Sequence, residues 1–369
     1  MNRWGKLCRV SFAGFGVALV LFAFAGPICA ATTPKFVYTA NYFTNNIYAY
    51  AIDSTTAALT PVKGSPYASG EGPFMVTVDP SNKFVYAANY MANNVSAYAI
   101  DSTTGALTPV AGSPFAAGTN PISIAFSSTG KFAYVANYHS DNVMVFSVNQ
   151  MTGALSPISS SPVAAGTMPA AVTLAPSGKF AYVANYGSNN VSAYSVNPKT
   201  GALTALNGMP VPAGLNPISV AIDPAGKFAY VANYSSDNLF VYAINSKSGV
   251  LTATSYSPVK SDRNPFWIEL DAAGKFAYVA NYGGYNVSAF SINSSTGGLT
   301  PVGGSPFKTR PAPMQVRLDQ SGKFAFTADA GTGSITGFNV NGATGALTPI
   351  KGFPYTTEAV PFAIAFAGQ

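Results

Sequence analysis

The chain has 369 residues, of which 48% are hydrophobic and only 9% charged, and its formal net charge is +6 at pH 7. Nucleic-acid binding favours a basic stripe with aromatic residues between the charges. The lysines here are scattered, so we expect no nucleic-acid partner. Cys8, Cys29 and the single histidine, His139, do not form a cluster with metal-ligand spacing, and we therefore expect no metal and no other cofactor.

Residues 1–30 have the pattern of a secretory signal peptide. Three basic residues precede an apolar run, and small residues follow at Ala30 and Ala31. Cleavage there removes both cysteines and three of the 19 basic residues, which leaves a net charge of about +3. We predict an exported, periplasmic or extracellular protein without a membrane span after cleavage. An uncleaved membrane anchor is the alternative, although the apolar run is short for a span.

After this leader, a Lys-Phe motif recurs at a constant interval of 48 residues. The seven copies begin at Lys35, Lys83, Lys131, Lys179, Lys227, Lys275 and Lys323. A fixed period of this size is typical of repeat architectures, so we assign residues 31–369 to one domain of seven repeats. Positions that recur in all copies are expected to build the scaffold, and positions that deviate are candidates for function.

The third copy shows the elements of one repeat. Residues 132–138, 143–148, 154–158 and 170–174 are apolar or β-branched runs, separated by polar or Gly/Pro-rich segments. They predict four short strands, and no segment has sustained helical periodicity. Four strands repeated seven times predict an all-β fold, a seven-bladed β-propeller with four-stranded blades.

The two ends of the chain predict how the ring closes. The first repeat lacks an innermost strand before it, whereas residues 361–366 form such a strand at the C-terminus. This strand is expected to complete the blade begun by residues 36–42 and to hide two strand edges. A recurring aromatic position is interpreted as packing between blades. It is occupied by Tyr38, Tyr86, Tyr134, Tyr182, Tyr230, Tyr278 and Phe326.

Several motifs within the repeats resemble a known family. The Tyr-Val-Ala-Asn segments resemble the YVTN repeat, and they begin at Tyr134, Tyr182, Tyr230 and Tyr278. The turn at 223–227 and the Asn-Val-Ser-Ala-Tyr strands are similar to those of the lactonase superfamily, which includes 6-phosphogluconolactonase-like proteins. The resemblance covers residues 35–369 and implies a seven-bladed propeller and, as one possible activity, lactone hydrolysis.

Two motifs of the family's enzymes are replaced here. Those enzymes carry His or Arg at the start of the innermost strand, and an Asn-Glu pair after the next strand. The first slots of this chain contain neither His nor Arg, and they begin at Pro73, Pro121, Pro169, Pro217, Pro265, Pro313 and Pro361. The Asn-Glu slot reads Asn-Tyr in six copies and Asp329-Ala330 in the last. No catalytic residue can therefore be transferred from the resemblance, and whether the protein is an enzyme stays open.

The arginines and glutamates after the leader gather in one part of the repeat. All lie in the loop into the innermost strand or in that strand, at Glu71, Glu269, Glu358, Arg263, Arg310 and Arg317. Around the ring they belong to four consecutive innermost strands, and the other three strands have no such charge. Trp267 and Gln315 deviate at a position that is otherwise mostly small. These eight residues predict a binding site at the mouth of the central channel.

This cluster has three interpretations. The charges form ion pairs without function, they bind a ligand, or they act in catalysis with Glu269 and Arg317 as candidates. We favour an exported monomer that binds a small anionic or polar molecule, or a protein partner, at the channel mouth. A lactone hydrolase and a cell-envelope interaction scaffold are the alternatives.

Glu269 and Arg317 hold the same repeat position on neighbouring strands, so they are expected to pair. Pairing would lower the pKa of Glu269 and make it a poor base near neutral pH, and we therefore predict weak or absent lactonase activity. A second recurring aromatic position could stack on sugars, but its regularity favours a scaffold role. It holds Tyr42, Tyr90, Tyr138, Tyr186, Tyr234 and Tyr282.

Overall fold

The computed structural model describes residues 34–357 and 359–368. The predicted signal peptide and Glu358 lie outside these residues. All 35 elements of the described ranges are β-strands. No helix within those ranges is long and apolar enough to cross a membrane. The predicted all-β class is therefore confirmed.

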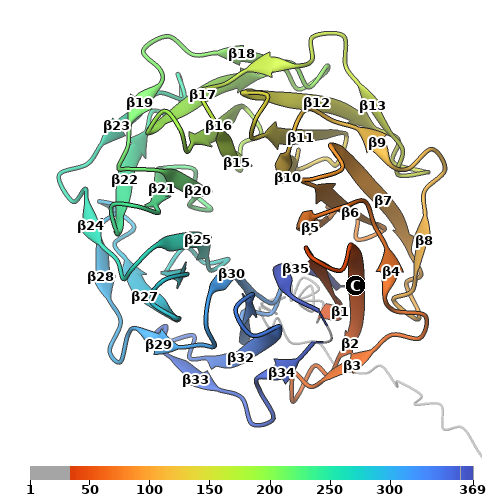
Figure 1. The fold of residues 1–369 in the computed structure, drawn as a ribbon. Helices are drawn as coiled ribbons and strands as arrows, with labels where there is room; N and C mark the ends of the chain where they lie inside the picture. The colour runs from red at the N-terminus through yellow and green to blue at the C-terminus, as the bar shows by residue number, and fades with distance from the viewer. Residues whose placement is uncertain (1–33, 358, 369) are drawn as a thin grey trace, which may run out of the picture. The chain divides into compact units, whose positions relative to one another are not determined.

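The strands form seven antiparallel sheets of five strands each. Figure 1 shows these sheets as blades around a common axis. The innermost strands are β5 (Pro73–Val78), β10 (Pro121–Phe126), β15 (Pro169–Leu174), β20 (Pro217–Ile222), β25 (Pro265–Leu270), β30 (Pro313–Leu318) and β35 (Pro361–Gly368). The predicted seven-bladed propeller is confirmed.

Two long strands lie outside each innermost strand, and they form the middle of the blade. The second strands are β1 (Pro34–Asn41), β6 (Phe84–Asn89), β11 (Phe132–Asn137), β16 (Phe180–Asn185), β21 (Phe228–Asn233), β26 (Phe276–Asn281) and β31 (Phe324–Asp329). The third strands are β2 (Asn46–Ile52), β7 (Asn94–Ile100), β12 (Asn142–Val148), β17 (Asn190–Val196), β22 (Asn238–Ile244), β27 (Asn286–Ile292) and β32 (Ser334–Val340).

Each blade ends in two short strands that both pair with its third strand. The first of them are β3 (Leu59–Pro61), β8 (Leu107–Pro109), β13 (Leu155–Pro157), β18 (Leu203–Ala205), β23 (Leu251–Ala253), β28 (Leu299–Pro301) and β33 (Leu347–Pro349). The second are β4 (Tyr67–Ala68), β9 (Phe115–Ala116), β14 (Val163–Ala164), β19 (Val211–Pro212), β24 (Val259–Lys260), β29 (Phe307–Lys308) and β34 (Tyr355–Thr356).

The two-residue strands were not predicted from the sequence. Each pairs with the start of the third strand, as β14 does through Val163↔Val143 and Ala164↔Asn142. Two residues are too few to show strand alternation, and they follow segments rich in Ser, Pro and Gly that predict loops.

The ring closes through the two ends of the domain. β35 pairs with β1 in antiparallel register from Pro34↔Gly368 to Asn41↔Pro361. Figure 1 shows the last strand, in blue, beside the first, in red. The C-terminal strand therefore completes the first blade, as predicted. Its pairing covers the edge of β1 that faces the channel axis, which would otherwise be free to pair with another chain.

Tyrosines join neighbouring blades, which confirms their interpretation as packing residues. The Tyr86 hydroxyl donates to the carbonyl oxygen of Gly153 in the next blade at 2.8 Å. Tyr38, Tyr134, Tyr182 and Tyr278 make the same contact with Gly105, Gly201, Gly249 and Gly345. Gly153 has a φ of 77°, and a Cβ added there would lie 2.4 Å from the Phe84 ring. Glycine therefore suits the turn at Gly153, whereas Ala57 holds the equivalent position of the first blade with a φ of 61°.

Candidate functional site

The innermost strands arrange their side chains at successive depths around the axis. They run antiparallel to the second strands, so Pro121 at the start of β10 lies level with Asn137 at the end of β11. A bulge follows this first pair in all seven blades. The chain then advances about 3.3 Å per residue. Residues at the start and at the end of one innermost strand therefore line different ends of the channel.

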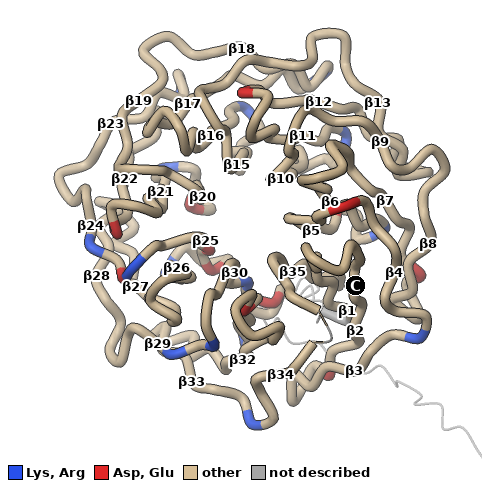
Figure 2. The backbone as a smooth tube through the Cα atoms, in the orientation of Figure 1, with Lys and Arg blue, Asp and Glu red and all other residues tan. Residues whose placement is uncertain are grey.

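One end of the channel is a polar chamber with a volume of about 370 Å³. The later residues of six innermost strands, β5, β10, β15, β20, β25 and β30, line most of it. Its polar side chains are Thr77, Ser123, Thr173, Ser219, Trp267, Glu269, Asp271 and Arg317. Figure 2 shows acidic and basic residues near β25 and β30, the strands that carry Glu269 and Arg317. We call this cavity the polar chamber.

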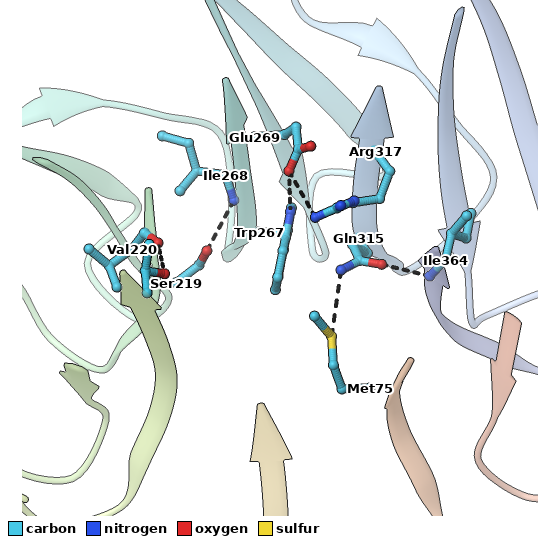
Figure 3. Close-up of polar contacts among 10 residues, drawn as sticks. Met75, Ser219, Val220, Trp267, Ile268, Glu269, Gln315, Arg317 and Ile364 are labelled. Atoms are coloured by element: carbon cyan, nitrogen blue, oxygen red, sulfur yellow. Dashed lines mark hydrogen bonds and ion pairs between the residues drawn. The ribbon is translucent and has the colours of Figure 1, made fainter. Parts of the chain in front are cut away.

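The chamber contains the predicted ion pair. Arg317 Nη1 lies 3.3 Å from Glu269 Oε2, and the Trp267 indole N–H donates to the same oxygen at 3.3 Å (Figure 3). The guanidinium carbon of Arg317 is also 6.0 Å from the Trp267 ring centroid, within the range of a cation–π contact. Three deviating residues therefore form one connected group.

Burial decides the protonation behaviour of Glu269. Only 18% of its side chain is exposed. Removal from water raises the pKa of Glu269, although Arg317, Trp267 and the backbone N–H of Leu318 each act to lower it. The pair with Arg317 therefore acts to lower this pKa, as expected, but the predicted net lowering was wrong, because the desolvation of the carboxylate outweighs its partners.

One donor beside the chamber is unsatisfied. Arg317 Nε is buried and has no hydrogen-bond partner among the described residues. A buried N–H without an acceptor is unfavourable, but this atom has almost no exposed surface, so an acceptor in the chamber can reach it only if the Arg317 side chain moves.

Gln315 lies between the chamber and the opposite end of the channel. Its side chain is 1% exposed. Its Oε1 accepts the backbone N–H of Ile364 at 2.6 Å, and its Nε2 is 3.7 Å from Met75 Sδ (Figure 3). Gln315, Met75 and Trp267 line a narrow space of about 20 Å³. We call this level the constriction.

In two other blades, a serine at the same repeat position as Gln315 joins neighbouring innermost strands. Ser123 and Ser219 accept the backbone N–H groups of Val172 and Ile268, both at 3.3 Å. Gln315 therefore connects neighbouring innermost strands and narrows the channel at the same point. This gives Gln315 a structural role that does not require a ligand.

The other end of the channel is an aromatic cavity of about 410 Å³, which we call the aromatic bowl. Its lining residues are Tyr42, Phe74, Tyr90, Ile122, Tyr138, Tyr186, Ile218, Tyr234, Phe266 and Phe362. Neighbouring tyrosine rings from Tyr42 to Tyr282 have centroids 5.8–6.4 Å apart. These tyrosines therefore line a cavity in addition to supporting the ring, which regularity alone did not reveal.

The lining of the bowl includes the strand positions at which the family resemblance places His or Arg. Phe74, Phe266 and Phe362 are the second residues of their innermost strands, and all three line the bowl. The polar catalytic positions of the family are thus apolar here.

The remaining predicted site residues lie apart from the polar chamber. Glu71, Arg263 and Arg310 are exposed in loops that precede the innermost strands, at the bowl end of the channel. Within the described ranges the only ion pair is Arg317–Glu269. The interpretation of the charges as paired therefore applies to that pair alone. Of the eight predicted site residues, Trp267, Glu269, Gln315 and Arg317 lie together, and Glu358 is outside the described residues.

One buried carboxyl group was not selected from the sequence. Asp329 accepts hydrogen bonds from Thr327 at 2.8 Å and Thr336 at 2.5 Å. Burial raises its pKa to about 7. The other six blades have Asn at this position, so the deviation from the repeat was the available signal.

Comparison with solved structures supports the fold. A periplasmic gluconolactonase from Pseudomonas aeruginosa is 19% identical with a TM-score of 0.78, over 90% of this chain and 98% of that one. A candidate 6-phosphogluconolactonase from Bacteroides fragilis is 24% identical with a TM-score of 0.77, over 91% and 99%. A protein from Lactobacillus plantarum is 22% identical with a TM-score of 0.77, over 90% and 99%.

Comparison with curated proteins finds no significant match. The family model for the seven-bladed β-propeller lactonases matches residues 22–116, 110–267 and 263–364. These segments include almost all of the repeats. The chain therefore belongs to the lactonase family of seven-bladed β-propellers.

Proposed function

We propose that this protein binds a small, uncharged polyhydroxylated molecule in the polar chamber. The observation that carries the proposal is the Glu269–Arg317 pair inside a cavity of about 370 Å³. A volume of this size lies in the lower part of the range of about 300–1,000 Å³ for small-molecule sites. Arg317, whose side chain is 32% exposed, supplies a donor, and Glu269 supplies an acceptor.

The charges of the chamber favour a neutral ligand. Glu269 and Asp271 contribute carboxyl groups, and Arg317 is the one cationic residue in the lining. A phosphate or carboxylate that reached Arg317 would also lie close to the Glu269 carboxyl group, which is 3.3 Å from Arg317 Nη1. A hydroxyl group can both donate to a carboxylate and accept from a guanidinium. Sugars, alditols and sugar lactones carry such groups, and one structural neighbour is described as a periplasmic gluconolactonase.

Ligand binding can be measured by thermal shift and calorimetry. Glucose, glucitol and freshly dissolved glucono-1,5-lactone are the neutral probes, and gluconate and 6-phosphogluconate are the anionic ones. We expect a neutral probe to raise the melting temperature. Glu269→Gln should weaken that binding at least tenfold. Arg310→Ala, which changes a charge outside the chamber, is the matched control. Equal affinity of the wild type and Glu269→Gln for every hit would exclude the chamber.

Lactone hydrolysis is the second candidate, and the raised pKa of Glu269 favours it. A carboxylate with a raised pKa can take a proton from water while the resulting hydroxide attacks the lactone carbonyl. Arg317 would then stabilise the oxyanion, and the protonated Glu269 would return the proton to the departing ring oxygen. The hydrogen bonds from Trp267 and Arg317 to Glu269 Oε2 oppose this role, since they stabilise the carboxylate and make it a weaker base.

Proton release during lactone opening separates the two candidates. We expect no acceleration above the rate in buffer. Fast turnover that Glu269→Gln abolishes, with an unchanged melting temperature, would establish the hydrolase instead.

Export is the remaining part of the proposal. Its support is the sequence pattern of residues 1–30. Expression with the native leader, followed by fractionation and N-terminal sequencing, should give a mature chain that begins at residue 31 or 32. Recovery of the full-length chain in the cytosol would contradict export.

A further inference from the structure

We propose that the aromatic bowl is a second, independent ligand site, which binds an uncharged two-ring aromatic molecule. The bowl lies at the opposite end of the channel from the polar chamber and shares none of its lining residues. The constriction of Met75, Trp267 and Gln315 lies between them. Occupancy of one site therefore neither requires nor reports occupancy of the other.

The lining of the bowl selects against anions and strongly hydrated ligands. Its ten lining residues are Tyr, Phe or Ile, so the cavity wall contains no carboxylate, guanidinium, ammonium or amide side chain. An anion that entered would lose water without gaining a paired charge. A sugar would leave most of its hydroxyl groups without partners, because phenol groups are the only side-chain polar groups available.

The existing ring contacts show how an aromatic guest would fit. Tyr42 and Phe362 are stacked, with centroids 4.7 Å apart and planes at 8°. Phe74 meets Phe362 edge-to-face, at 5.4 Å and 89°. Both arrangements are favourable for aromatic pairs. A flat ring can therefore bind to the faces or to the edges that the wall presents.

A gap in the circle of tyrosines sets the size of the guest. The seventh blade has Ala330 where the other six have tyrosine. A neighbouring cavity of about 380 Å³ reaches Ala330 and Gly331, and it shares Phe74, Tyr234, Phe266 and Phe362 with the bowl. The space therefore continues from the bowl towards Ala330, which favours a ligand with two fused rings over a ligand with one ring.

The test uses 2-naphthol, a neutral and fluorescent two-ring phenol, with the intact mature protein. We expect saturable binding with one site per chain. The double variant Phe74→Leu/Phe266→Leu keeps apolar side chains of similar size and should weaken binding at least tenfold. Tyr256→Leu makes the same kind of change at an aromatic residue that is 50% exposed and lines neither cavity, so it should bind normally.

Two further measurements keep the outcome decisive. If the double variant fails to fold, Tyr186→Leu replaces it, with the same expected direction. Glucose and tetramethylammonium are tested as competitors, and neither should displace 2-naphthol. Displacement by tetramethylammonium would identify a cation site and overturn the proposal, as would displacement by glucose. Unchanged affinity in the folded bowl variants would also overturn it.

Glu269→Gln separates this proposal from the proposed function. It should leave 2-naphthol binding unchanged and weaken polyol binding. Loss of both together in a folded variant would contradict the independence of the two sites.

Discussion

The two ends of the channel differ in how far they follow the repeat. Around the aromatic bowl, five blades contribute an equivalent tyrosine to the lining, and a sixth tyrosine, Tyr282, lines the neighbouring cavity. In the polar chamber, the equivalent position is Thr or Ala in five blades, and Glu269 and Arg317 in the other two. The bowl is therefore a product of the repetition, whereas the chamber is a local departure from it.

This difference shows that deviation and repetition indicate different kinds of site. Glu269, Trp267 and Arg317 are recognisable in the sequence because their neighbours around the ring are small. A cavity made from recurring tyrosines looks like a scaffold until the geometry of the ring is known. Both cavities lie along the axis around which the innermost strands of the blades are arranged (Figure 1).

Removal of residues 359–369 should destroy both ends at once and has the largest expected effect. β35 supplies Phe362 to the bowl, and its Ile364 N–H is the donor to Gln315 at the constriction. Its loss also leaves the β1 edge open, which promotes association between chains. We expect insoluble or oligomeric protein in size-exclusion chromatography. A monomeric truncation that melts cooperatively would contradict closure through β35.

Arg317→Leu should damage the chamber and spare the bowl. It leaves Glu269 largely buried without its cation, and we expect a loss of about 2–3 kcal/mol in the free energy of unfolding at pH 8. The loss should be smaller at pH 5 than at pH 8, because the raised pKa and the absence of Arg317 both shift Glu269 towards its neutral form as the pH falls. Urea denaturation at both pH values measures it.

The rescue by a second change gives the control for this prediction. Adding Glu269→Gln to Arg317→Leu removes the unpaired charge, so most of the lost stability should return at pH 8. Binding of 2-naphthol should persist in both variants. No recovery in the double variant would mean that packing of the Arg317 stem, rather than charge, accounts for the loss.

Asp329→Asn restores the repeat near the bowl and should stabilise the protein above neutral pH. The pKa of Asp329 is raised from 3.8 to about 7 in the folded state. The folded state therefore retains a proton that the unfolded state loses, and stability falls as the pH rises from about 4 to about 7.

The size of this effect follows from the pKa shift and from the lost hydrogen bonds. Each pKa unit corresponds to about 1.4 kcal/mol, but Asn makes weaker hydrogen bonds to Thr327 and Thr336 than a carboxylate does. We expect a net gain of about 2 kcal/mol at pH 8 and little change at pH 4. Thermal melts across this range test it, and a gain that does not depend on pH would contradict the assigned titration.

The fold was predictable because periodic constraints repeat seven times. A closed propeller was indicated by the interval of 48 residues, by the strand patterns and by the innermost-type strand at the C-terminus. The two-residue strands such as β14 were not predictable, because their identity comes from pairing with β12 rather than from local pattern.

The site was predictable only in part. The pairing of Glu269 with Arg317 followed from their equal repeat position, whereas the direction of the Glu269 pKa depends on burial. Sequence position also grouped Arg263 and Arg310 with that pair. Arg263 and Arg310 precede the innermost strands, whereas Glu269 and Arg317 lie near the ends of those strands. The distance between the two groups along the channel axis follows only from the placement of the strands in the structure.

The smallest predicted effect compares two equivalent tyrosines that the structure treats differently. Tyr86 donates a buried hydrogen bond to Gly153 at 2.8 Å, whereas the buried Tyr230 hydroxyl has no partner among the described residues. Removal of a satisfied buried hydroxyl costs about 1 kcal/mol, and removal of an unsatisfied one relieves a desolvation penalty. Tyr86→Phe should therefore lower the free energy of unfolding by about 1 kcal/mol.

Tyr230→Phe is the matched control, because both variants lose the same atom from a ring that is 0% exposed. It should leave the stability unchanged or raise it slightly in urea denaturation. Equal losses in the two variants would mean that Tyr230 does bond to the turn of the next blade in solution. Six of the seven interfaces between blades would then share this hydrogen bond, and Phe326, which has no hydroxyl group, would mark the one exception.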